Sequence, residues 1–300
     1  MLGKLPFSVR TDLPRFQPTS PGEQLWLTLR EMFVTESHRA YPTLELTELP
    51  SWLEPPGAYA ERHIDAAVTT TAYRLLKAAK RAQKEAELDG EATRSHEGQS
   101  LLEDHIWRHM VEHMSFAALD PRPRRVIPYL VYQSLVVEKA DISGPTRSAV
   151  LQEARDSAAE GDIRCYCCGD TLWAPSFETS MKNISLDHVW PRTMGGKSTA
   201  DNLLPVCDPC NGAKQDRASW GVYGVVYDHA LVERGSQDDD RLLGLSLHRR
   251  AAGALAIAQY LTLKDAFVRL GPRTEVELID EDAGRHVFNF RAHDEQRFSF

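Results

Sequence analysis

Two pairs of cysteines, each with CxxC spacing, constrain this chain more than any other feature of its sequence. The first pair is Cys165 and Cys168, and the second is Cys207 and Cys210. A CxxC pair places two thiolates at the separation that a tetrahedral zinc ion needs, and two such pairs complete its coordination sphere. The spacing therefore predicts a structural Zn²⁺ site in the middle of the chain.

The fifth cysteine, Cys167, lies between the members of the first pair. Only Cys165 and Cys168 reproduce the spacing of the second pair, so we interpret Cys167 as a spare buried thiol. Disulfides are the weaker alternative, because the N-terminus has no apolar signal sequence. The longest apolar runs, residues 126–137 and 251–263, are shorter than the ~18 residues that span a bilayer. We expect a cytoplasmic protein without a membrane partner.

The composition is that of a globular protein. Apolar residues make up 42% of the 300 residues and charged residues 26%, which suits about two domains with ordinary cores. The formal net charge is -8, which disfavours avid nonspecific binding to nucleic acid. Any nucleic-acid partner must therefore meet a local basic surface.

Helical patterns dominate the N-terminal half. Capping boxes at Ser20 with Glu23 and at Ser100 with Glu103 mark two helix starts, the first after an irregular arm. The apolar run 126–137 favours a buried helix, although its β-branched residues leave a strand open. In order, the patterns predict helices over residues 20–37, 64–90, 100–119, 126–137 and 146–159.

The C-terminal part mixes helices and strands. Gly, Val and Tyr residues over 220–227 indicate a short strand or bend, and 242–260 is helical by composition. Thr262 caps a short helix, and the pattern over 275–290 predicts a β-hairpin. The fold class is therefore α+β and predominantly helical. We expect a helical recognition or regulatory domain over 1–160, a metal-binding module over 161–225, and C-terminal helices with a β-hairpin over 226–300.

Two surface patterns in the helical half have more than one interpretation. One is a basic helix flank, which is either a solvated face or a stripe that contacts phosphates. Its residues are Arg74, Lys77, Lys80, Arg81 and Lys84. The other is the four-residue spacing of His105, His109 and His113. With Glu112 it matches the HxxEH pattern of inverted zinc peptidases, but no further carboxylate ligand is evident, and an ordinary core stripe adjoins it.

The stretch around the second cysteine pair carries several short motifs in a fixed order. They are CxxCG, DH, P, GG, NL, CxxCN and K, and this succession resembles the zinc-ribbon branch of the HNH endonuclease family. The resemblance covers residues 164–217, with a longer gap between Cys168 and Asp187 than the family pattern has. The matching residues are Cys165, Cys168, Gly169, Asp187, His188, Pro191, Gly195, Gly196, Asn202, Leu203, Cys207, Cys210, Asn211 and Lys214.

The resemblance implies a ββα-metal fold and a metal-dependent endonuclease. Phosphodiester hydrolysis needs a base, and His188, with an ordinary pKa near 6.5, suits that role. Asp187 and Asn211 offer oxygen ligands for catalytic Mg²⁺ or Mn²⁺. By resemblance, Asn202 holds the loop of His188 in its active orientation.

Partners and pathway follow less directly. Arg192, Lys197 and Lys214 are candidates for phosphate contacts, although the whole segment carries as many acidic as basic residues. DNA is the expected substrate, with RNA as the other nucleic acid, and cleavage of both strands requires a homodimer or repeated nicking. By analogy alone we expect a restriction or phage-defence effector with a companion protein. The alternative is a catalytically inactive zinc-ribbon module that binds nucleic acid or protein.

Overall fold

The computed structural model is mostly helical in the part of the chain that it describes. The described residues are 15–40, 57–86, 92–114, 121–158, 160–176, 181–216, 218 and 237–272. Two compact units divide the chain: Met1–Ala140 with Arg192–Lys197, and Asp141–Pro191 with Ser198–Phe300. The three-domain division expected from the sequence stays a prediction.

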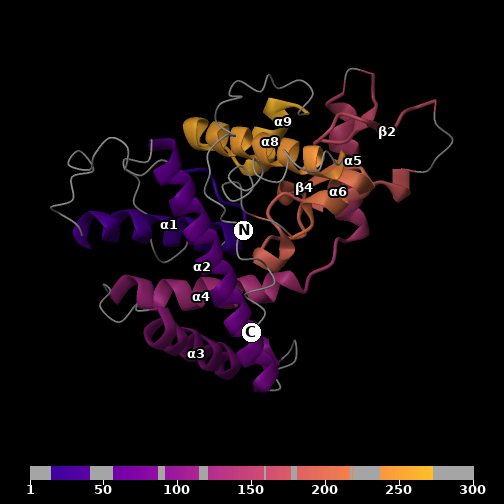
Figure 1. Cartoon of the computed structure of the whole chain (residues 1–300). Coiled ribbons are helices and arrows are strands. Elements are labelled where there is room, and N and C mark those ends of the chain that lie inside the picture. The colour runs from indigo at the N-terminus through magenta and orange to yellow at the C-terminus, as the bar shows by residue number, and fades with distance from the viewer. Residues whose placement is uncertain are drawn as a thin grey trace. The chain divides into compact units, whose positions relative to one another are not determined.

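The first unit is built from helices that pack around a leucine-rich core. Its described elements are α1 (Pro21–Ala40), α2 (Gly57–Glu85), η2 (Ala92–Arg94), α3 (His96–Met114), α4 (Pro121–Glu138) and η5 (Arg192–Met194) (Figure 1). Helices α1, α2 and α4 pack against one another, and α3 packs on α2 and α4. Fully buried side chains from each helix form the core, among them Leu29, Leu75, Ile106 and Leu135. The apolar run 126–137 lies in α4, so the helical interpretation is confirmed.

The start of α1 confirms the first predicted capping box. Glu23 Oε2 accepts hydrogen bonds from the backbone N–H of Ser20 at 2.8 Å and of Thr19 at 2.6 Å. In return, the Glu23 N–H donates to Ser20 Oγ at 3.3 Å. Glu23 is only 1% exposed, and burial raises the pKa of its carboxyl group. The box therefore satisfies helix-end donors that are shielded from water.

The second predicted capping box is wrong. Helix α3 begins at His96, one turn before Ser100, because Ser95 Oγ accepts the Gly98 N–H at 3.0 Å. Glu103 lies inside the helix, where it accepts a hydrogen bond from the Gln99 side chain at 2.7 Å. Two serines precede acidic residues in this region, and the local pattern alone did not show which of them caps the helix.

The second unit combines short strands with helices. Its described elements are α5 (Gly144–Asp156), β1 (Ile163–Arg164), β2 (Thr171–Trp173), η4 (Met181–Asn183), β3 (Ser185–His188), η6 (Ala200–Asn202), β4 (Leu203–Val206), α6 (Asp208–Lys214), α8 (Gln237–Gln259) and α9 (Leu263–Leu270). Strands β1 and β2 pair antiparallel, as do β3 and β4. Thr262 caps α9 as predicted, since its Oγ accepts the Asp265 N–H at 3.0 Å.

Helix α5 covers the hairpin of β3 and β4 and fixes its orientation. Val150 and Leu151 of α5 share a buried cluster with Ile184, Leu186 and Leu203. Helix α6 follows β4 directly and packs against β3. Two strands and a helix thus succeed one another with the Asp187–His188 pair on the first strand. The predicted strand or bend at 220–227 and the hairpin at 275–290 lie outside the described residues.

Within the described ranges, the search for a helix of sufficient length and apolarity to cross a membrane finds none.

Candidate functional site

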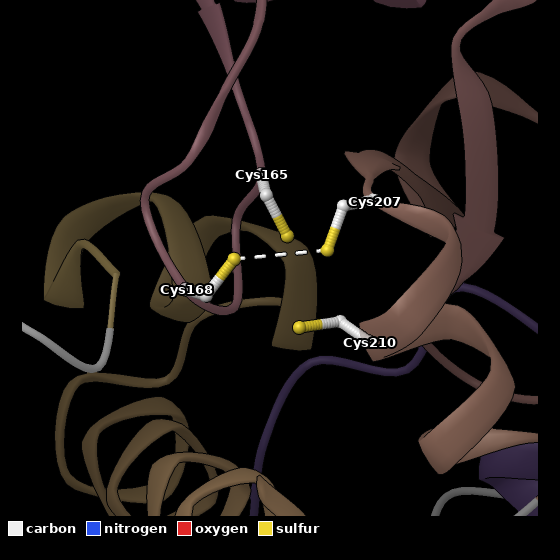
Figure 2. A group of neighbouring side chains, drawn as sticks. All are labelled: Cys165, Cys168, Cys207 and Cys210. Carbon is white, nitrogen blue, oxygen red and sulfur yellow. Dashed lines mark hydrogen bonds between the residues drawn. The ribbon is translucent and has the colours of Figure 1, made fainter.

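The four paired cysteines meet at one point in the second unit, as predicted. Cys165 and Cys168 lie in the turn after β1, Cys207 follows β4, and Cys210 lies in the first turn of α6. Their sulfur atoms all lie within 4.8 Å of one another and point toward a common centre (Figure 2). Cys168 Sγ and Cys207 Sγ are 3.7 Å apart. Tetrahedral Zn–S bonds of about 2.3 Å separate sulfurs by about 3.8 Å, so the cluster fits a zinc ion.

Backbone hydrogen bonds explain why the two cysteine pairs come together. The Gly169 N–H donates to Cys165 O at 2.9 Å and closes a tight turn, in which Gly169 has φ +80°. Only glycine adopts such a conformation readily, so the glycine after the first CxxC has a backbone reason. The Tyr166 N–H donates to Pro205 O at 3.0 Å, which joins this turn to β4.

Cys167 lies apart from the four-cysteine cluster. Its side chain is 1% exposed and packs in a small core with Val206 and Leu245. Burial raises the pKa of the Cys167 thiol well above its ordinary value. The residue is the buried thiol that the spacing indicated.

Asp187 and His188 pair with Leu204 and Leu203 of β4. Successive side chains of a strand point to opposite faces of the sheet. Asp187 is accordingly buried at 4% exposure, whereas His188 is half-buried. The two residues of the DH motif therefore contact different groups.

The Asp187 carboxylate is held by a phenol and an ammonium group. Tyr166 Oη donates to Asp187 Oδ2 at 2.5 Å, and Lys214 Nζ donates to Oδ1 at 2.6 Å. Lys214 Nζ also donates to His188 O at 2.7 Å. Lys214 is 4% exposed, so burial lowers its pKa while the neighbouring Asp187 raises it. This lysine, predicted as a phosphate contact, thus binds the strand that carries the DH motif.

His188 is oriented through its ring. His188 Nε2 lies 3.0 Å from Ser198 Oγ, and Ser198 is 7% exposed. The motif search did not single out Ser198, because nothing in its local sequence marks a hydroxyl that reaches a histidine ten residues earlier.

Asn202 fixes the backbone just beyond His188. Its Oδ1 accepts the Trp190 N–H at 2.7 Å, and its Nδ2 donates to Trp190 O at 3.0 Å. Asn202 and Trp190 are each 1% exposed. The amide therefore clamps both backbone groups of one residue in a buried position.

Asn211, the other predicted cation ligand, is half-buried on α6, the helix that packs against β3. Arg192 and Lys197, both half-buried, bound a short segment that belongs to the first unit. Their phosphate contacts stay predictions.

The glycine pair in that segment has a packing reason. The Gly22 N–H of α1 donates to Gly195 O at 3.2 Å, and Gly195 has φ +81°. A Cβ on Gly195 would lie 2.4 Å from Ser134 Oγ of α4. Only glycine fits this notch between α1 and α4.

Helix α8 contributes a buried arginine to the same site. Arg249 is 5% exposed, and its Nη2 lies 3.4 Å from Val189 O, next to His188. Its positive charge also helps to lower the pKa of Lys214. The motif pattern did not reveal this residue, which comes from a helix beyond the HNH-like segment.

The predicted histidine pattern on α3 gives no sign of a peptidase centre. Within the described ranges, the four cysteines form the only group of metal-ligating side chains close enough to hold an ion. Glu112 Oε2 lies 3.9 Å from His113 Nε2, and both side chains are more than half exposed.

Comparison with known families agrees with the motif order. The HNH endonuclease family matches residues 165–219, which contain the cysteine cluster, β3, β4 and α6. The suspected resemblance is therefore confirmed for this segment of the chain, and it suggests a nuclease. Comparisons with curated proteins and with solved structures gave no match.

Proposed function

We propose that the protein is a metal-dependent endonuclease that hydrolyses phosphodiester bonds in DNA. The observation that carries this proposal is the match of residues 165–219 to the HNH family, in which His188 lies at the end of β3. We further propose that β3, β4 and α6 form the ββα-metal fold of that family. A cytoplasmic location belongs to the proposal, because a zinc-cysteine site needs reduced thiols.

His188 acts as the general base in this proposal. Ser198 holds the ring at Nε2, so the proton of the attacking water passes to Nδ1. Asn202 keeps the backbone after His188 in place through Trp190. These contacts supply the fixed geometry that proton abstraction requires.

Cys165, Cys168, Cys207 and Cys210 hold a structural zinc ion in this proposal. All four ligands are protein thiolates, which leave no open coordination position for a substrate. The ion links the turn after β1 to the junction of β4 and α6. Its contribution is the stability of the segment that carries His188.

Asp187 and Asn211 are the proposed ligands of a catalytic Mg²⁺ or Mn²⁺ ion. Their oxygen atoms suit a hard cation, and the contact of Lys214 with Asp187 Oδ1 shows that this carboxylate already holds a positive charge. The donor set therefore fits such an ion when Lys214 Nζ withdraws from Oδ1. When bound, the cation stabilises negative charge on the phosphate.

Arg192 and Lys197 are proposed to contact phosphates. A homodimer or a companion protein, and a role in restriction or phage defence, extend the proposal by analogy with other HNH proteins. An inactive zinc-ribbon binding module is the alternative function.

Incubation of the purified protein with supercoiled plasmid and with Mg²⁺ or Mn²⁺ tests the proposal. We expect cleavage that falls about 10²- to 10⁴-fold in His188→Ala, because a general base contributes about that much. His96→Ala is the matched control, since His96 is an exposed histidine at the start of α3. Intact plasmid with both metals, or equal cleavage by wild type and His188→Ala, would favour the inactive module.

A further inference from the structure

The structure brings together two sequence patterns that stand apart along the chain, the basic flank of α2 and the histidines of α3. Both helices belong to the first unit, and they pack against each other (Figure 1). We call the combined surface the α2/α3 basic face. Its residues are Arg74, Lys77, Arg81 and Lys84 of α2 and His105, His109 and His113 of α3.

The α2 residues of this face lie on one side of the helix. Arg74, Lys77, Arg81 and Lys84 are three or four residues apart, which is the spacing of neighbours along one helix face. The stripe is about 15 Å long at 1.5 Å per residue. Arg74, Arg81 and Lys84 are exposed and Lys77 is half-buried, so their charges face solvent.

Lys80, which the sequence pattern grouped with this stripe, has another role. Its Nζ lies 2.7 Å from Glu138 Oε1 of α4. The ion pair joins α2 to α4, and we leave Lys80 out of the α2/α3 basic face.

His109 shows that the two helices present their basic groups to the same place. Burial lowers the pKa of His109, and the nearby charges of His113, Arg74, His105 and Arg81 lower it further. The rings of His109 and His113 are 4.9 Å apart. Arginines of one helix thus lie beside histidines of the other.

Two acidic side chains of α3 lie near these histidines. Glu112 is 3.9 Å from His113, and the carboxylate of Glu103 accepts a hydrogen bond from Gln99. The α2 stripe itself contains no acidic residue between Arg74 and Lys84.

Like charges at this spacing destabilise a helix, so folding gives no reason to collect them. The charge balance of the chain gives a functional one. The net charge is -8, and the HNH-like segment carries as many acidic as basic residues. A polyanion would therefore be repelled by most of the protein, and a local basic surface is needed to hold it. Duplex DNA carries one charge per about 1.7 Å of axis, so a 15 Å stripe meets several phosphates.

We propose that the α2/α3 basic face binds the phosphate backbone of duplex DNA without reading its sequence. The choice of DNA rests on the proposed nuclease function. Contacts of this kind position nucleic acid and carry no base information. The face gives the first unit the role of holding substrate, while the second unit carries the chemistry.

The test is the binding of a fluorescent DNA duplex in EDTA, measured by anisotropy at several salt concentrations. The variant is Arg74→Gln with Arg81→Gln. The control is Arg125→Gln with Lys139→Gln, which removes the same charge from exposed positions in and just after α4. We expect roughly tenfold weaker binding in the variant and a salt dependence reduced by about two contacts, because each lost phosphate contact lowers the slope by about 0.9. The control should stay within about twofold of wild type.

Arg74→Lys with Arg81→Lys keeps both charges and should retain binding, which separates loss of charge from misfolding. Equal affinity and equal salt dependence in the glutamine variant and its control would overturn the proposal, as would wild-type protein that does not bind the duplex. EDTA removes divalent cations, so the outcome does not depend on cleavage. Binding through this face without nuclease activity would refute the proposed function alone. Cleavage with unaltered binding in the variant would refute this inference alone.

Discussion

The cysteine cluster and strand β3 lie in the same HNH-like segment, yet the sequence predicts them to different depths. The cluster has four identical ligands whose spacing already specifies the ion, and the structure adds only their meeting point. Strand β3 has two functional side chains on opposite faces, each with partners from elsewhere in the chain. Ligands of a closed metal site are set by local spacing, whereas the environment of a catalytic strand is set by tertiary packing.

The largest effect that this comparison predicts is the loss of zinc. Cys207→Ser removes one of four thiolates, and we expect zinc to be lost together with the cooperative unfolding transition of the second unit, because metal binding is coupled to folding. Metal analysis and thermal melting measure both. Cys167→Ser is the control, since Cys167 is buried outside the cluster and should keep about one zinc ion per chain. Zinc retained in Cys207→Ser would break the comparison.

The buried pair of Asp187 and Lys214 should give the next largest effect. Lys214→Met leaves the Asp187 carboxylate buried without its cation, which costs about 3–5 kcal/mol of unfolding free energy. We also expect Mn²⁺ to stabilise this variant more than wild type, because the carboxylate no longer binds an ammonium group. Thermal melting with and without Mn²⁺ measures both quantities. Equal Mn²⁺ stabilisation of the two proteins would show that Lys214 does not compete for the proposed cation site.

Loss of the Asn202 clamp should have a smaller effect. Asn202→Ala removes two hydrogen bonds and leaves the buried Trp190 backbone groups unsatisfied, at a cost of about 2 kcal/mol. Denaturant unfolding measures this cost against Asp201→Ala, a change at the exposed neighbouring position. A clamp that orients His188 also predicts a lower cleavage rate at temperatures where the variant remains folded. Unchanged stability and an unchanged rate would argue against this role.

Local signals predicted most of the described helices because their cause lies within a few residues. The caps at Ser20 and Thr262 are examples, and each bonds a residue three positions further on. Where two local signals competed, at Ser95 and Ser100, the choice between them was wrong. Sequence patterns within one helix could not show which cap the packed helix uses.

Long-range partners were the part that sequence could not provide. Tyr166 reaches Asp187, and Arg249 reaches the backbone of Val189 from a helix beyond the HNH-like segment. Neither residue type, at its position, carries a spacing rule. The same holds for the α2/α3 basic face, whose two halves were visible as separate patterns but whose meeting depends on how the helices pack.

Zinc content and plasmid cleavage, measured on the same preparation of His188→Ala, test the central claim most directly. The claim is that the cysteines support the segment while β3 carries the chemistry. It predicts about one zinc ion per chain, a melting temperature near that of wild type, and cleavage reduced at least a hundredfold. Wild-type cleavage by this variant, with its zinc retained, would contradict the account.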